Sequence, residues 1–132
     1  MSKAWKEAEK EVAKALGGMR RIRINYSESI GDIIHPTYSI EVKYGKQIPK
    51  YLLVDKSTLL RVGYHDYWLY PHGMKGKPRR VVERERAMFL TNAMAQAKIY
   101  DPSLKPMVCL KGKNMRGFVI ARPLDRPQRS RV

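Results

Sequence analysis

The chain has 132 residues, 43% of them hydrophobic, which argues against a disordered tail and predicts one folded domain. Lys and Arg total 27 against 12 acidic residues, and the net charge of +15 favours a polyanionic partner such as a nucleic acid. The charged N-terminus lacks the apolar run of a signal peptide, and no stretch offers the roughly 18 to 20 apolar residues that span a bilayer. We therefore expect a soluble, cytoplasmic protein without a membrane partner. Charge alone leaves ribosomal, chromatin-like, membrane-surface and nuclease proteins open.

The first predicted element is an amphipathic helix over residues 3–16. Gly17 and Gly18 follow it and are typical of a helix stop. Its apolar residues recur at the spacing of one helix face, and they are Trp5, Ala8, Val12, Ala15 and Leu16.

Strands follow this helix. Residues 20–26 alternate between apolar and polar side chains, which predicts a half-buried strand, and residues 27–31 read as a loop. Residues 32–34 and 38–44 then predict a hairpin around a bend at 35–37, where His-Pro-Thr disfavours a regular strand.

The middle of the chain, residues 45–82, gives no clear pattern. Residues 52–62 are compatible with either a strand or a helix, and the basic stretch 71–80 is typical of an exposed loop. Aromatic residues crowd this region, where they either stack on bases, line a dimer interface or, as is more common, pack in a core. They are Tyr51, Tyr64, Tyr67, Trp68 and Tyr70.

The last third predicts a helix and two closing strands. The helix covers residues 82–100, ends at Asp101-Pro102, and has an apolar face of Leu90, Ala93, Met94 and Ala97. The strands cover 106–111 and 117–122, around a turn at 112–116.

These elements predict an α/β fold with a mixed central β-sheet flanked by helices. No repeat or linker divides the chain, so we expect a single domain over residues 1–122. Residues 123–132 are rich in Pro and Arg and predict a basic, mobile C-terminal tail.

Glu9 is unusual because it lies inside the apolar stripe of the first helix. At about 100° per residue it is roughly 40° from Trp5 and 60° from Val12, whereas Glu7 falls near the opposite face. A carboxylate that faces a core is unfavourable unless it is paired or bound to a metal. Glu9 therefore either pairs with an arginine at the edge of the stripe or serves as a ligand.

The predicted hairpin carries the second group of polar residues. Alternate residues of a strand share a face, so Glu41 and Lys43 point together while Ile40 and Val42 point into the other layer. The bend can place Asp32 on the Glu41 side of the neighbouring strand, where two carboxylates and a lysine would converge. The alternative is a solvated outer face with an ordinary Glu-Lys pair.

In this order the residues resemble the PD-(D/E)XK nuclease superfamily, in particular its archaeal-type Holliday junction resolvase branch with its viral relatives. The helical motif corresponds to Ala8-Glu9-Lys10-Glu11-Val12, the serine loop before the aspartate to residues 27–32, and the strand motif to Glu41-Val42-Lys43. Gly31 stands where the superfamily often has proline. The resemblance covers about residues 5–48.

The resemblance implies a Mg²⁺-dependent endonuclease, with Mn²⁺ as a substitute. Asp32, Glu41 and the backbone carbonyl of Val42 would be metal ligands, and Glu9 would ligate directly, through a water or at a second metal. Lys43 would orient and help deprotonate the attacking water or stabilise charge in the transition state. Ser29 would contact the scissile phosphate, unless it only forms a turn.

The branch also implies a substrate, branched double-stranded DNA, and a homodimer, because resolving a four-way junction by paired nicks needs two active sites. One alternative is another endonuclease of the superfamily, acting on linear, nicked or sequence-specific DNA. A second alternative is a basic nucleic-acid-binding protein without catalysis.

Basic residues near these motifs and in the 75–80 loop are candidates for DNA contacts. They would hold phosphates rather than read bases, although a merely solubilising role is equally compatible with their positions. The candidates are Arg20, Arg21, Arg23, Lys46, Lys50, Lys75, Lys77, Arg79 and Arg80.

The histidines and the single cysteine suggest no further chemistry. His35, His65 and His72 lack metal-ligand spacing, and a turn role is the better interpretation of His35. Cys109 lies in an apolar run, which predicts a small buried residue and leaves no partner for an internal disulfide.

Overall fold

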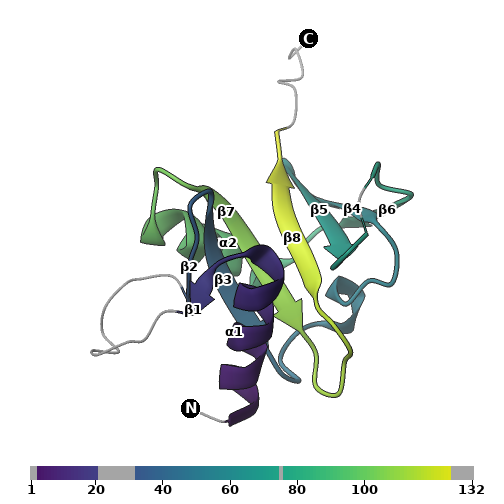
Figure 1. Cartoon of the computed structure of the whole chain (residues 1–132). Coiled ribbons are helices and arrows are strands. Elements are labelled where there is room, and N and C mark those ends of the chain that lie inside the picture. Colours follow the sequence, from purple (N-terminus) through teal and green to yellow (C-terminus); the bar gives the residue numbers. More distant parts are fainter. Residues whose placement is uncertain (1–2, 21–31, 75, 126–132) are drawn as a thin grey trace.

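The computed structural model describes residues 3–20, 32–74 and 76–125 (Figure 1). These residues form two α-helices, one short 3-10 helix and eight strands. In chain order they are α1 (Lys3–Leu16), β1 (Met19–Arg20), β2 (Ile33–Ile34), β3 (Tyr38–Tyr44), η1 (Lys50–Leu52), β4 (Thr58–Val62), β5 (His65–Pro71), β6 (Arg80–Arg84), α2 (Met88–Tyr100), β7 (Lys105–Lys111) and β8 (Val119–Leu124).

The eight strands make one mixed sheet in the order β1-β2-β3-β7-β8-β5-β4-β6. The pairs β3–β7 and β4–β6 are parallel, and the other neighbours are antiparallel. The predicted α/β class with a mixed sheet flanked by helices is thus confirmed. Among the described residues no helix is long and apolar enough to cross a membrane.

The two helices cover opposite faces of the sheet (Figure 1). Val12 and Ala13 of α1 share a core with Ile40 and Val42, which alternate onto one face of β3. The apolar side of α2 packs on the other face, against residues such as Val108 of β7. Side chains of β3 that do not face α1, including Glu41, therefore point towards α2.

The N-terminal predictions agree well with the structure. Helix α1 has the expected bounds, although Ala15 is exposed and Ala13 is buried in its place. Strand β1 begins at Met19, and the rest of the predicted strand 20–26 and the loop 27–31 lie outside the described residues. The hairpin is confirmed, since Ile33 pairs with Ile40 across the bend.

Gly18 marks the close approach of the end of α1 to β2. Its N–H donates to the carbonyl of Ala13 at 2.9 Å. A Cβ added to Gly18 would lie 2.7 Å from a methyl carbon of Ile33 and 2.8 Å from the Ile34 carbonyl oxygen. Only glycine fits there, because the backbone of β2 occupies the space that a side chain needs.

The middle of the chain resolves into strands. The undecided segment 52–62 contains β4, and the aromatic-rich segment after it forms β5. Of the crowded aromatic residues, Tyr67 is buried in the core, Tyr51, Trp68 and Tyr70 are half-buried, and Tyr64 is exposed.

The prediction of a helix over residues 82–100 is wrong at its start, because residues 80–84 form strand β6 and α2 begins at Met88. Its predicted apolar face is confirmed, since Leu90, Ala93, Met94 and Ala97 are all buried. The closing strands lie within two residues of their predicted bounds. Strand β8 includes Pro123 and Leu124, paired with β5, so the folded part extends two residues into the predicted tail; residues 126–132 lie outside the described part.

Candidate functional site

Asp32 is tied to β3 by two hydrogen bonds on either side of Glu41. Its N–H donates to the carbonyl of Ile40 at 3.2 Å, and its Oδ2 accepts from the N–H of Val42 at 2.8 Å. The residue is 4% exposed. The hairpin thus fixes a buried carboxylate against the strand that carries Glu41, as the sequence predicted.

Glu41 is the most perturbed carboxylate of this group. It is 5% exposed, and its Oε1 lies 3.4 Å from the Nζ of Lys43, while its Oε2 is buried and accepts no hydrogen bond from the described residues. Burial, followed by the repulsion of Asp32, raises the pKa of Glu41 from 4.5 to about 7, against the opposing effects of Lys43 and Tyr100. The predicted convergence of Asp32, Glu41 and Lys43 is therefore present.

Helix α2 completes the surroundings of Lys43. The Nζ of Lys43 donates to the side-chain oxygen of Gln96 at 3.3 Å, and Tyr100 interacts with the carboxylate of Glu41. Gln96 and Tyr100 were not among the predicted site residues, because nothing local to the hairpin indicates a helix more than 50 residues away. Their spacing of four, which puts them on one side of a helix, was the available signal.

Glu9 is buried as its helix phase predicted, at 4% exposure, and it pairs with an arginine. The Nε of Arg20 lies 3.0 Å from Oε1 of Glu9, and the arginine side chain is 23% exposed. Helix α1 covers the face of β3 opposite to the one that carries Glu41. Glu9 thus belongs to an ion pair on the α1 side, which matches the arginine-partner interpretation, and its role as a ligand stays a prediction.

The pair of Asp32 and Glu41 fits a divalent cation of the magnesium type. Mg²⁺ is commonly held by one or two carboxylates and several waters. Here two buried carboxylates repel each other, and in the described part of the chain one oxygen of Glu41 has no hydrogen-bond donor. Over residues 3–20, 32–74 and 76–125, no three His, Cys, Asp or Glu side chains are grouped closely enough to hold a metal, so Glu9 does not join the pair as a third ligand in this arrangement. Val42 contributes its N–H to Asp32, and the role of its carbonyl stays a prediction.

The predicted DNA contacts in the described part of the chain come from several segments. Arg20 is engaged by Glu9. The exposed candidates are Lys46, Lys50, Lys77, Arg79 and Arg80. The remaining predicted residues lie outside the described part of the chain, and they are Ser29, Arg21, Arg23 and Lys75.

His35 has a structural role, as predicted. Its Nδ1 accepts from the N–H groups of Thr37 and Tyr38 at 3.0 and 3.2 Å, and its Nε2 lies 2.9 Å from the carbonyl oxygen of Leu16. The ring therefore closes the bend and ties the hairpin to the end of α1. Cys109 is buried among apolar residues, also as predicted.

Compared with protein-family models, curated proteins and solved structures, the chain matches none of them.

Proposed function

We propose that the chain is a metal-dependent DNA endonuclease of the PD-(D/E)XK type. The observation that carries the proposal is the buried pair of Asp32 and Glu41, with Lys43 on the same strand face as Glu41. One oxygen of Glu41 accepts no hydrogen bond from the residues that the structure describes. Two buried carboxylates that repel each other destabilise a fold unless a cation compensates them. Such an arrangement is typical of functional sites, where a perturbed pKa is retained for chemistry.

In this proposal Asp32 and Glu41 hold Mg²⁺ or Mn²⁺, which when bound supplies a nucleophilic water and neutralises charge on the phosphate. The hydrogen bond from Val42 orients Asp32, so that its carboxylate stays aligned with the strand. Glu41 and Gln96 hold the ammonium group of Lys43 in place. From there Lys43 orients the attacking water or stabilises the charge that develops on the phosphate oxygens.

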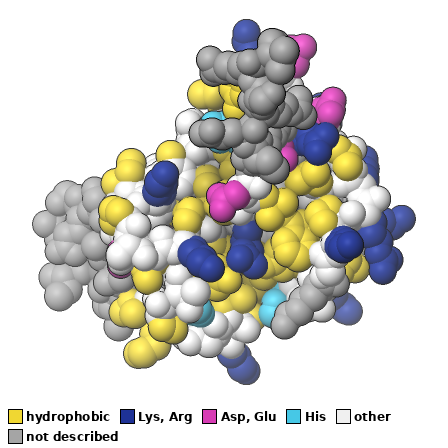
Figure 2. Space-filling model, turned by 90° about the horizontal axis from the view of Figure 1, so that it is seen from above, with side chains coloured by type: hydrophobic (Ala, Val, Ile, Leu, Met, Phe, Trp, Pro, Cys, Tyr) yellow, Lys and Arg dark blue, Asp and Glu magenta, His cyan; other side chains and the backbone are white. Residues whose placement is uncertain are grey.

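The substrate that we propose is a four-way DNA junction, cut by paired nicks in a homodimer. The net charge of +15 supports a polyanionic substrate, and Figure 2 shows Lys and Arg side chains spread over one face among hydrophobic groups, with few acidic ones. The preference for a junction rests on the resemblance of residues 5–48 to the resolvases. Activity on linear or nicked DNA is the alternative within the same chemistry.

The test is a cleavage assay with purified protein, a labelled four-way junction and a linear duplex of matched sequence, with and without Mg²⁺. We expect metal-dependent, paired nicks in the junction. Equal rates on both substrates would refute the junction preference. No cleavage of any DNA with Mg²⁺ or Mn²⁺ would refute the enzyme and leave a non-catalytic binder.

Asp32→Asn tests the metal site itself. Asparagine retains an oxygen that can accept the N–H of Val42, so the hairpin should survive while the negative charge is lost. We expect at least a 100-fold loss of cleavage with unchanged junction binding. Asp125→Asn, a change at an exposed aspartate, is the matched control and should cut at the wild-type rate. Wild-type cleavage by Asp32→Asn would show that this carboxylate is not a metal ligand.

A further inference from the structure

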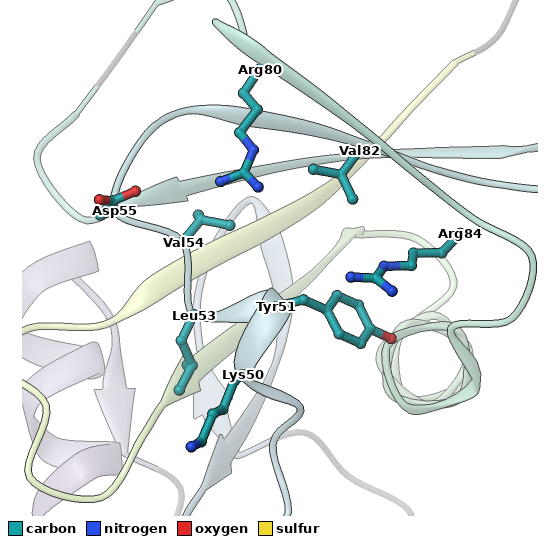
Figure 3. Close-up of a pocket in the computed structure, with 8 residues that line it drawn as sticks. All are labelled: Lys50, Tyr51, Leu53, Val54, Asp55, Arg80, Val82 and Arg84. Carbon is teal, nitrogen blue, oxygen red and sulfur yellow. The ribbon is translucent and has the colours of Figure 1, made fainter.

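A small pocket lies between strand β6 and the segment 50–55 (Figure 3). Its volume is about 130 Å³, well below the roughly 300 to 1,000 Å³ of sites for drug-sized ligands. The lining combines apolar groups such as Tyr51 and Val82 with the cations of Lys50, Arg80 and Arg84. A space of this size suits one small charged group rather than a whole organic cofactor.

The strand geometry of β6 aligns the two arginines. Arg80, Val82 and Arg84 alternate with Val81 and Glu83, so they share one face of the strand. The parallel register with β4 fixes this face, because Arg80 pairs with Thr58 and Arg84 with Val62. Figure 3 shows both arginines reaching from β6 towards the 50–55 segment.

Tyr51 positions one of the two guanidinium groups. The central carbon of the Arg84 guanidinium lies 4.5 Å from the centre of the Tyr51 ring, a distance at which a cation is attracted to the ring face. Tyr51 in turn packs against the hydrophobic core that contains the apolar face of α2. Arg84 is thus held by a rigid partner and still keeps its N–H donors for a ligand. In Figure 3 the ammonium end of Lys50 points away from both guanidinium groups, which leaves the two arginines as the central cations.

The pocket has an excess of positive charge. Three cations line it against one carboxylate, that of Asp55. Within residues 3–20, 32–74 and 76–125, no carboxylate forms an ion pair with Arg80 or Arg84. Guanidinium groups that are not neutralised by the protein favour an external anion, and their planar donors match phosphate oxygens in pairs.

We propose that this pocket is a phosphate anchor that holds a backbone phosphate of a nucleic acid strand at a distance from the cleaved bond. The inference rests on the proposed function for the role of the strand, but not for the chemistry of the pocket. None of Asp32, Glu41 and Lys43 lines the pocket, so a phosphate held there is a different one from the phosphate at the carboxylates. The anchor would fix the direction in which DNA leaves the carboxylates, without reading its sequence.

The test compares two double variants that each remove two positive charges. Arg80→Gln with Arg84→Gln changes the pocket, whereas Arg86→Gln with Arg116→Gln changes two exposed arginines outside it. Each pair is made in the wild-type chain and in Asp32→Asn, and thermal unfolding checks that each variant is folded. Binding of a fluorescent 20-base-pair duplex is measured by anisotropy over a range of salt concentrations, and cleavage is measured with Mg²⁺.

We expect the pocket variant to bind DNA at least 10-fold more weakly and to lower the slope of log affinity against log salt by about 1. The control should change affinity less than 3-fold. A nucleoside monophosphate and inorganic phosphate, added as competitors, distinguish a nucleotide from a bare phosphate as the preferred group. The anchor would be refuted if both variants lost affinity equally. It would also be refuted if polyglutamate displaced the labelled DNA as effectively as unlabelled DNA of equal charge.

The two proposals fail in different ways. If the wild type cuts DNA but the pocket variant binds like the control, the anchor is refuted and the endonuclease stands. If the pocket variant loses binding but no chain cuts DNA with Mg²⁺ or Mn²⁺, the endonuclease is refuted and the anchor stands. A wild-type chain that binds no DNA refutes the anchor whatever its other activity.

Discussion

Replacing Glu41 with glutamine should stabilise the metal-free protein while it abolishes cleavage. Burial and the neighbouring Asp32 raise the pKa of Glu41 from 4.5 to about 7, so the folded chain retains a proton that the unfolded chain has already released. Stability therefore falls as pH rises from about 4.5 to about 7, and the loss is complete above that range. The difference between the two pKa values corresponds to a loss of about 3 kcal/mol in the free energy of unfolding at pH 8. Glutamine avoids this loss because it stays neutral.

Urea unfolding in the presence of a chelator measures the effect. We expect Glu41→Gln to raise the free energy of unfolding by about 3 kcal/mol at pH 8, or the melting temperature by roughly 10 °C, and by less than about 1 kcal/mol at pH 5. Glu85→Gln removes an exposed charge and should change stability by less than about 0.5 kcal/mol at either pH.

Mg²⁺ provides the complementary measurement. A ligand that binds only the folded state raises its stability, so added Mg²⁺ should raise the melting temperature of the wild type and leave that of Glu41→Gln unchanged. A variant no more stable than the wild type at pH 8, or a gain of the same size at pH 5, would refute the argument that a buried ionised Glu41 destabilises the metal-free fold.

Two further predictions concern pH and the anchoring of a turn. At limiting Mg²⁺, cleavage should rise with pH up to about 7 and then level off, because the protonated carboxyl of Glu41 is a poor ligand; a rate that is flat between pH 5.5 and 7.5 would contradict this. Lys111→Met should lower stability by about 2 kcal/mol in urea unfolding, because its Nζ bonds to Glu11 at 2.8 Å and to the carbonyls of Met115 and Gly117 at 2.9 and 3.0 Å. The exposed Lys113→Met is the control, and equal stability of the two variants would show that these bonds contribute nothing.

The elements that sequence patterns predicted well are those with a local cause. Helix α1 has a clear apolar stripe and a glycine stop, and the bend at His35 is closed by hydrogen bonds within four residues and by one to the end of α1. The apolar face of α2 is likewise a property of its own spacing. The close placement of Asp32 and Glu41 follows from the short hairpin alone, which is why it could be predicted without the rest of the sheet.

The elements that were missed depend on distant partners. Residues 80–84 form a strand because they pair with β4, about 20 residues earlier, and this parallel pairing leaves no local signature. The helix predicted from residue 82 therefore concealed the pocket, since it left Arg80 in a loop and Arg84 in a helix, whereas both belong to one strand. Gln96 was missed for the same reason, because its contact with Lys43 spans 53 residues.

The two buried glutamates, Glu9 and Glu41, differ in the charges that surround them. Helix phase predicted a buried carboxylate at Glu9. A buried carboxylate needs a compensating positive charge, and either an arginine or a metal ion can supply it. Here Arg20 supplies the charge: its Nε lies 3.0 Å from Oε1 of Glu9, and the pair links β1 to α1. Glu41 lies across the sheet from this pair, and one of its oxygens accepts no hydrogen bond from the described residues. Of the two buried glutamates, Glu9 has an arginine beside it and Glu41 has the repulsion of Asp32, and a ligand role for either one stays a prediction.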